Sequence, residues 1–125
     1  MTDLTDDIIG AAIEVHRHLG PGLLESTYEE CLCRELHLRD IAFQRQVTLP
    51  LNYKGLRLED RHRVDLVIVN RVAVELKAIE VLFPVHHSQI LTYLRLGNWP
   101  VGLLINFNVP VLIEGVHRKI WNPRN

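Results

Sequence analysis

The chain of 125 residues is long enough for one compact domain and leaves little room for a second. Its 47% hydrophobic and 23% charged residues are ordinary for a globular protein, so a core of useful size is available. The net charge of −1 argues against a strongly basic protein that coats nucleic acid, although it does not exclude nucleic acid as a partner.

Signals of cellular location are few. The longest apolar stretches, such as 64–69, are too short to cross a bilayer, so no membrane association is expected. Residues 1–7 are acidic where a secretory signal would be basic, which predicts a cytoplasmic protein. Cys31 and Cys33 lie two residues apart in a predicted helix, and this spacing is neither a redox nor a zinc-knuckle motif. We expect two buried thiols and no disulfide.

Two helices are predicted at the start of the chain. Apolar residues recur every three to four positions over Leu4–Leu19, as on the buried face of an amphipathic helix. Thr5 is the expected N-cap, and Gly20 is free to adopt the left-handed conformation that ends a helix. The second helix runs from about Leu23 to Arg39, and its inner side is made by Tyr28, Cys31, Leu32, Glu35 and Leu36.

Strands and one further helix fill the rest of the chain. Alternating apolar residues over Phe43–Tyr53 predict a strand, and Lys54-Gly55 predicts a turn after it. Two strands follow, at Arg63–Val69 and Val72–Lys77, and both are rich in Val and Leu and therefore expected to be buried on both faces. The remaining elements are a helix from Pro84 to about Leu96, a strand at Val101–Asn106 and a last edge strand at Gly115–Trp121. This order predicts an α/β or α+β single domain over residues 1–125, in which helices flank a mixed central sheet.

Charged residues interrupt two of these apolar strands. Side chains in a strand alternate between its faces, so Glu75 and Lys77 share one face, and Asp65 repeats the anomaly in the neighbouring strand. Burying such charges is costly unless each finds a partner. One explanation is an internal salt bridge from Lys77 to Asp65 or Glu75, which leaves one carboxylate over. A bound divalent cation, Mg²⁺ or Mn²⁺, accounts better for the excess negative charge because it takes carboxylate oxygens.

The loop between these two strands decides whether the charges can meet. With a two-residue loop at Asn70-Arg71, Asp65 would lie opposite Leu76 and would face away from Glu75. A shared site needs one more residue in the connection. We therefore predict a three-residue loop or a bulge around Asn70.

Residues on two helices are further candidates. Glu25 lies on the helix face of Tyr28 and points inward from the first turn, and the alternative is an acid placed there for the helix macrodipole. In the third helix, Gln89 and Tyr93 share a face with His86 and could contact a phosphate or orient an acid. The alternative for this group is a partly exposed polar face, which the residues alone favour.

The same residues resemble the signature of the GxxExxY protein family. The resemblance covers nearly the whole chain in order, and the succession of Glu, Asp, Glu-x-Lys and Gln-xxx-Tyr is specific, although Glu-x-Lys alone is weak. That family is placed in the PD-(D/E)XK nuclease superfamily, whose core is a mixed four-stranded sheet flanked by helices, with the site at one edge of the sheet. Val64 stands where the motif usually has a proline. The segments that carry the resemblance are Gly22–Tyr28, Arg63–Val69, Val74–Ala78, Gln89–Leu94 and Gly102–Phe107.

The resemblance implies a metal-dependent hydrolase of phosphodiester bonds. Asp65 matches the motif aspartate, Glu75 the second acid and Lys77 the motif lysine, while Glu25 matches the acid of the leading helix. The expected ligands of Mg²⁺ or Mn²⁺ are the carboxylates of Asp65, Glu75 and Glu25 and the carbonyl of Leu76. Lys77 would position the attacking water or stabilise charge at the phosphorus.

Substrate contacts are expected around this site. Gln89 and Tyr93 resemble the Gln-xxx-Tyr element of RecB-type superfamily members and would contact the nucleic-acid backbone. Arg63 is a candidate phosphate contact, as are Arg61 and Arg95, and a solvated charged rim is the alternative for each. The expected partner is nucleic acid, with DNA in first place.

Two other functions stay open. The first is a catalytically inactive nuclease-fold domain that binds nucleic acid or a partner protein, which the near-neutral charge and the small size favour somewhat. The second is a hydrolase of small phosphoesters. A homodimer would suit a two-strand substrate, and exposed Trp99 or Trp121 could serve its interface, although packing in the core is the commoner fate of tryptophan.

Overall fold

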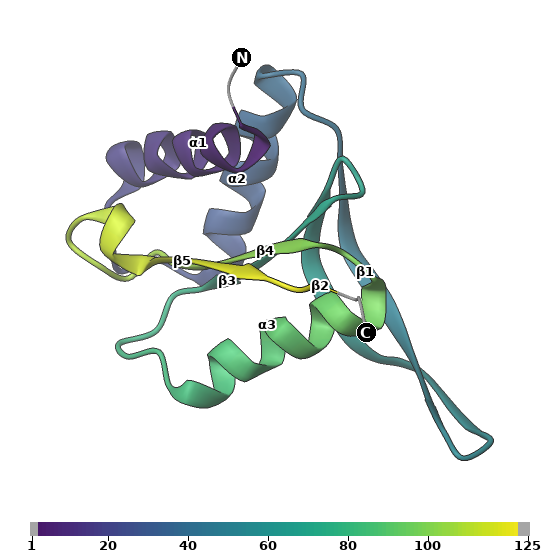
Figure 1. Cartoon of the computed structure of the whole chain (residues 1–125). Helices are drawn as coiled ribbons and strands as arrows, with labels where there is room; N and C mark the ends of the chain where they lie inside the picture. Colours follow the sequence, from purple (N-terminus) through teal and green to yellow (C-terminus); the bar gives the residue numbers. More distant parts are fainter. Residues whose placement is uncertain (1–2, 123–125) are drawn as a thin grey trace.

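The computed structural model describes residues 3–122, and within that range the chain forms one small α+β domain (Figure 1). Helices α1 and α2 cover one face of a five-stranded mixed sheet, and α3 covers the other. The predicted fold class and the predicted order of helices and strands are confirmed. The elements are α1 (Leu4–Leu19), α2 (Glu25–Leu38), β1 (Phe43–Tyr53), β2 (Leu56–Ile68), β3 (Val72–Lys77), α3 (Pro84–Gly97), β4 (Val101–Asn106), a short 3-10 helix η1 (Leu112–Gly115) and β5 (Val116–Ile120).

The sequence had predicted Thr5 as the N-cap of helix α1, and this prediction is wrong. The helix is capped by Asp3. The side chain of Asp3 accepts a hydrogen bond from the backbone N–H of Thr5 at 3.3 Å. Aspartate caps a helix at least as well as threonine, so the helix extends back to the earlier of the two candidates. At the other end Gly20 has φ 69°, and its N–H donates to the carbonyl of His16 at 2.7 Å. The predicted glycine terminus is confirmed.

Helix α2 begins at Glu25, later than the expected Leu23. The loop before it is closed by Tyr28, whose hydroxyl donates to the carbonyl of Gly20 and accepts from the backbone N–H of Leu23. The Tyr28 ring stacks on Phe107, with ring centroids 4.5 Å apart. These contacts hold Glu25 at the first position of the helix, beside the end of β3.

The sheet has the strand order β1-β2-β3-β4-β5, with β3 and β4 parallel and the other neighbours antiparallel. It has one strand more than the four-stranded core that the family resemblance implied. Strand β2 also begins at Leu56 instead of Arg63. Residues 56–62 are almost all exposed, so they lack the apolar alternation by which a strand is recognised in a sequence. The hairpin of β1 and β2 consequently extends past the rest of the domain, at the lower right of Figure 1.

Two cores lie on opposite faces of the sheet, one under α1 and α2 and the other under α3. Trp99 belongs to the second core. It is 7% exposed, and its Nε1 donates to Oδ1 of Asn70 at 3.3 Å. The idea that Trp99 is exposed for an interface is therefore wrong, because this indole finds both apolar contacts and a hydrogen-bond partner inside the fold. Trp121 is half-buried against the same core.

Two smaller expectations concern the thiols and the membrane. Both cysteines are free thiols as predicted, and Cys33 is buried, but Cys31 is only half-buried, which differs from the expectation of two buried thiols. Over residues 3–122, the helices are too short and too polar for any of them to span a membrane.

Candidate active site

The connection between β2 and β3 has three residues, 69–71, because Ile68 pairs with Val72. The prediction of an odd-numbered loop around Asn70 is confirmed. The same register places Asp65 directly opposite Glu75. Paired residues in neighbouring strands project from the same face of a sheet, so the two carboxylates can share one site.

Asp65 and Glu75 lie where the two strands separate. The backbone pairing of β2 with β3 reaches only Leu66 and Val74. Beyond that pair, the N–H of Asp65 donates to Oε1 of Glu75 at 2.9 Å, and the N–H of Leu76 donates to Oδ2 of Asp65 at 2.8 Å. The carboxylates thus replace backbone carbonyls as acceptors, which satisfies amides that the parting strands would leave unpaired. The two carboxylates therefore bridge the strands at the point where their backbone pairing ends.

Glu75 is the most deeply buried of the predicted acids, with 5% of its surface exposed. The pKa of Glu75 is raised to about 8, mainly by burial and then by the charge of Asp65, while the hydrogen bond from the Asp65 N–H and the charge of Lys77 oppose the shift. Burial also raises the pKa of Asp65, against the effect of the hydrogen bond from Leu76. Both carboxylates would therefore be stabilised by an added positive charge.

Glu25 and Lys77 complete this charged cluster. Desolvation raises the pKa of Glu25. The charge of Asp65 raises it as well, and the charge of Lys77 lowers it. The charge of Lys77 acts on Glu25, Asp65 and Glu75 alike. Within residues 3–122, however, no direct salt bridge joins Lys77 to any of them. The internal ion pair offered as the simpler explanation of these charges is therefore not formed.

Gln89 and Tyr93 line a surface pocket of about 300 Å³ between α3 and β2, which His62 also lines. Tyr93 is 6% exposed, so this part of α3 is more buried than a polar surface face would be. Burial raises the pKa of Tyr93, the charges of Glu75 and Asp65 add to the shift, and a side-chain hydrogen bond with Gln89 opposes it. Tyr93 therefore lies within reach of the charges of the acidic cluster, and the substrate contact that the Gln-xxx-Tyr resemblance implied stays a prediction.

Three residues that the sequence did not single out belong to the same cluster: Glu29, Arg45 and Gln46. Buried Glu29 accepts hydrogen bonds from Nη2 of Arg45 at 3.0 Å and from Nε2 of Gln46 at 3.2 Å. The same Gln46 amide donates to Oδ1 of Asp65 at 3.3 Å. Glu29 follows Glu25 by one helical turn, a spacing that could have revealed it. Gln46 carries no comparable signal in the sequence, because it resembles any polar residue of a half-exposed strand.

Gln46 also has an unusual backbone. Its φ is 50°, in the left-handed region that residues other than glycine rarely adopt. Strained residues of this kind persist when the surroundings hold them, and they cluster at functional sites. Gln46 is opposite Asp65, between the regular pairs Arg45–Leu66 and Val47–Val64 of β1 and β2. This left-handed backbone turns the side-chain amide of Gln46 toward Glu29 and Asp65.

The donor atoms fit a hard divalent cation that retains several waters. The side chains of Glu25, Asp65 and Glu75 offer only oxygen donors, which Mg²⁺ and Mn²⁺ prefer. Among the hydrogen bonds of the described chain, Glu75 uses Oε1 and leaves Oε2 unengaged. No three His, Cys, Asp or Glu side chains in residues 3–122 are already gathered closely enough to hold a metal. Asp65 and Glu75 could therefore supply only part of a coordination shell, with water in the remaining positions, and a ligand role for exposed Glu25 stays a prediction.

Other predicted residues lie apart from the acids. Arg61 and Arg63 are exposed on β2 ahead of Asp65, and Arg95 is exposed on α3. His86 closes the first turn of α3, since its Nδ1 accepts a hydrogen bond from the N–H of Phe83 at 2.9 Å. His86 therefore has a structural role, and contact of the exposed arginines with phosphate stays a prediction.

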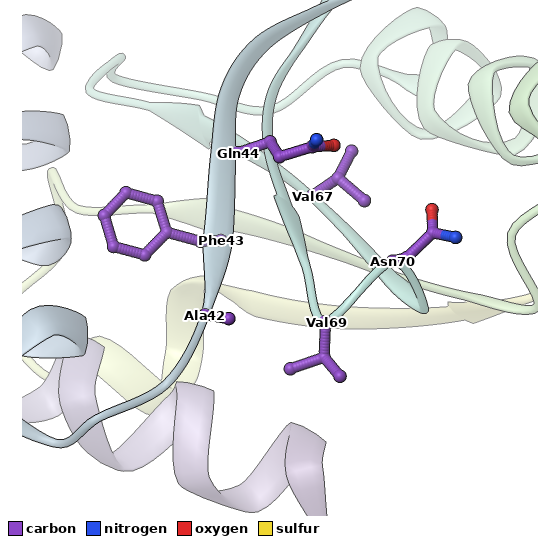
Figure 2. Close-up of a pocket in the computed structure, with 6 residues that line it drawn as sticks. All are labelled: Ala42, Phe43, Gln44, Val67, Val69 and Asn70. Atoms are coloured by element: carbon purple, nitrogen blue, oxygen red, sulfur yellow. The ribbon is translucent and has the colours of Figure 1, made fainter.

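A larger pocket, of about 440 Å³, lies at the start of β1 and the β2–β3 loop. Figure 2 shows Gln44, Val67 and Asn70 on one side of β1, with Phe43 pointing to the other side, toward the helices. Its lining has no acid, base or thiol, so this pocket offers no group for hydrolytic chemistry. The residues that line it are Ala42, Phe43, Gln44, Val67, Val69 and Asn70.

Comparison with known proteins agrees with the geometry. The model of the PD-(D/E)XK nuclease superfamily matches residues 2–119. The chain therefore belongs to the PD-(D/E)XK nuclease superfamily, and its five-stranded sheet with three helices is consistent with a restriction-endonuclease-like fold. Members of this superfamily are generally nucleases and typically use divalent metals. The finer resemblance to the GxxExxY family stays a prediction.

Two further comparisons add little. The crystal structure of SSO0001 is similar over 99% of this chain and 80% of that chain, with 18% sequence identity and a TM-score of 0.44. A similarity at this level carries no argument about function. No curated protein matches the chain.

Proposed function

We propose that this chain is a divalent-metal-dependent nuclease that hydrolyses phosphodiester bonds, with DNA as the first substrate to test. Membership of the superfamily supports a nuclease-type activity. The observation that carries the proposal is the pair Asp65 and Glu75, two carboxylates with raised pKa values beside Lys77 where β2 and β3 separate. Buried acids that repel each other and lack a salt bridge favour a cation as their partner.

The roles follow from the chemistry of each group. Asp65 and Glu75 would hold Mg²⁺ or Mn²⁺ together with the carbonyl of Leu76, and Glu25 would bind directly or through water. Such an ion lowers the pKa of a bound water and offsets the charge of the phosphate. The ammonium of Lys77 would hold the attacking water or donate to a phosphate oxygen as charge develops there.

Substrate would be held by groups around the acids. Gln89 can donate to a phosphate oxygen through its amide, and Tyr93 through its hydroxyl. Their position in a surface pocket beside the acidic cluster supports this role. Arg63, exposed two residues before Asp65 in the same strand, would contact a neighbouring phosphate.

The deciding experiment is a cleavage screen. Purified protein is incubated with single-stranded and duplex DNA and RNA, with Mg²⁺, with Mn²⁺ and with EDTA. We expect cleavage of at least one substrate with metal and none with EDTA. Lys77→Ala should lower the rate at least about a hundredfold, the typical cost of losing one transition-state donor. Lys119→Ala, in the edge strand β5, is the matched control and should cut normally.

Calorimetry with Mn²⁺ separates the enzyme from an inactive nuclease-fold domain. An active site of this design should bind Mn²⁺, and Asp65→Ala should abolish that binding. Absence of both Mn²⁺ binding and cleavage would favour the inactive domain. Cleavage that persists in EDTA or in Lys77→Ala would overturn the proposed mechanism.

A further inference from the structure

The hairpin formed by β1 and β2 continues beyond the sheet, and its segment from Asn52 to Arg63 is called the hairpin arm below (Figure 1). Almost every residue of the arm is exposed. Two of these are large and apolar: Tyr53 is 61% exposed and Leu56 is 56% exposed, and they pair across the turn at Lys54-Gly55. A hairpin tip with an aromatic and a leucine in solvent presents an apolar surface without a partner in this domain.

The arm is basic on a protein whose net charge is −1. It contains four basic and two acidic residues. Arg57 pairs with Glu59 at 3.3 Å, but in the described chain no salt bridge engages Lys54, Arg61 or Arg63. The free cations therefore run from the tip of the arm to its root, and phosphate is the anion that complements such a row.

The tip combines a cation with an aromatic ring. Nζ of Lys54 lies 5.3 Å from the centre of the Tyr53 ring. This ammonium lies over one face of the ring, so the other face can stack on a nucleobase while the ammonium meets a phosphate of the same strand. The faces of bases are hidden by stacking inside a duplex, so this surface suits unpaired nucleotides.

The arm also leads directly into the candidate site. Asp65 is in the same strand as Arg61 and Arg63, and His62 at the root of the arm lines the pocket of Gln89 and Tyr93. At about 3.3 Å per residue, the span from Leu56 to Asp65 is at most about 30 Å. A stacked nucleic-acid strand that advances about 3.4 Å per nucleotide would cover that span with about nine nucleotides.

We propose that the hairpin arm binds an unpaired nucleic-acid strand and guides it to the acids at the root of β2. Tyr53 would stack on a base, and Lys54, Arg61 and Arg63 would contact phosphates spaced along the strand. The proposal rests on the proposed function, since it names the substrate as nucleic acid with a single-stranded segment. It adds a binding surface that extends from the candidate site to the tip of the hairpin.

The test is the binding of a labelled 20-nucleotide single-stranded DNA of mixed sequence, followed by fluorescence anisotropy in EDTA to prevent cleavage. Tyr53→Ala should raise Kd about five- to a hundredfold, the range for loss of one base–aromatic stack, and Tyr53→Phe should bind like the original chain. Arg61→Gln should lower the slope of log K against log salt by about 0.7, as for one lost phosphate contact with a single strand. A duplex of the same length should respond much less to Tyr53→Ala.

Matched controls lie on the other face of the domain. Arg17→Gln changes an arginine whose side chain is 73% exposed in α1, and Leu38→Ala changes an apolar residue that is 60% exposed at the end of α2. Both should leave Kd unchanged. The proposal is overturned if Tyr53→Ala binds single strands as the original chain does. It is also overturned if light scattering shows a dimer that Tyr53→Ala dissociates, because the arm would then contact a second copy.

The arm and the nuclease site fail in different ways. Single-strand binding that depends on Tyr53, without cleavage under any metal condition, would support the arm and overturn the nuclease. Cleavage that depends on Lys77, with Kd unaffected by Tyr53→Ala, would support the nuclease and overturn the arm.

Discussion

Asp65 and Glu75 hold each other in place through the backbone: the N–H of Asp65 donates to the Glu75 carboxylate, and the Asp65 carboxylate accepts from the N–H that follows Glu75. Each acid therefore has a structural acceptor role besides any chemical one. An amide side chain keeps an acceptor oxygen and removes the charge. Substitution by the matching amide should consequently separate the two roles, which alanine would not.

Asp65→Asn tests the metal role of this pair. The variant should keep the acceptor for the N–H of Leu76, so its fold and unfolding temperature should change little. It should lose Mn²⁺ affinity by at least about tenfold, since a neutral amide is a poorer ligand than a carboxylate. Calorimetry with Mn²⁺ gives the affinity. Asp60→Asn, an exposed aspartate of the same strand, is the control and should bind Mn²⁺ normally.

Glu75 should make stability depend on pH. Its pKa is about 8 in the folded chain, above the ordinary value of 4.5, so the folded state binds this proton more tightly than the unfolded state does. The stabilisation is fully present below pH 4.5 and is lost as pH rises through 8. In EDTA, the unfolding temperature of the original chain should therefore fall between pH 5 and pH 9 relative to that of Glu75→Gln.

Added Mg²⁺ gives the control for this prediction. A cation stabilises the ionised carboxylate, so it should restore the original chain at pH 9 more than it restores Glu75→Gln. Parallel melting curves of the two proteins at every pH in EDTA would contradict the assigned pKa shift.

Gln46 is predicted to position Asp65 without touching substrate. Gln46→Ala removes the amide that joins Glu29 to Asp65, and Gln46→Gly does the same while accepting φ 50° without strain. Both variants should weaken Mn²⁺ binding about ten- to a hundredfold, the usual cost of losing a residue behind a metal ligand. Gln46→Gly should keep more stability than Gln46→Ala.

A role in stability alone would look different. Gln46→Ala would then lower the unfolding temperature and leave Mn²⁺ affinity unchanged in the folded protein. Gln44→Ala, which alters an exposed glutamine of the same strand, is the matched control and should affect neither measurement.

Two glycines in helices should respond in opposite directions to alanine. A Cβ at Gly97 would collide with the ring of Trp99, whereas a Cβ at Gly10 would meet only the flexible end of Arg39 at 3.4 Å. Gly97→Ala should cost about 1–3 kcal/mol of unfolding free energy through overpacking. Gly10→Ala should add up to about 1 kcal/mol through helix propensity. Urea titration measures both, and a stabilised Gly97→Ala would contradict the packing of Trp99.

The charges in the buried strands could be interpreted from the sequence because strand geometry is strict. Side chains alternate with period two, so Asp65 and Glu75 can meet only across an odd-numbered loop, and that argument predicted the observed connection. The first helix was equally predictable, since α1 spans Leu4–Leu19 as expected. Both predictions rest on the regular periodicity of side chains in strands and helices.

Contacts that depend on irregular backbone could not be predicted in this way. The amide of Gln46 reaches Asp65 only because its backbone is left-handed, and no pattern in β1 signals that conformation. The arm was missed for another reason: residues 56–62 are exposed on both faces, so hydrophobic periodicity is absent although the strand is present. Trp99 was misjudged because its partner Asn70 is distant in sequence.

The three-residue connection after Ile68 has a consequence for relatives of this chain. A homologue that lacked one residue there would still align with this chain at Asp65, Glu75 and Lys77. Its aspartate would nevertheless project from the face of the sheet opposite to that of its glutamate. A single gap at this point should therefore indicate that the paired carboxylates are separated, even where every motif residue is retained.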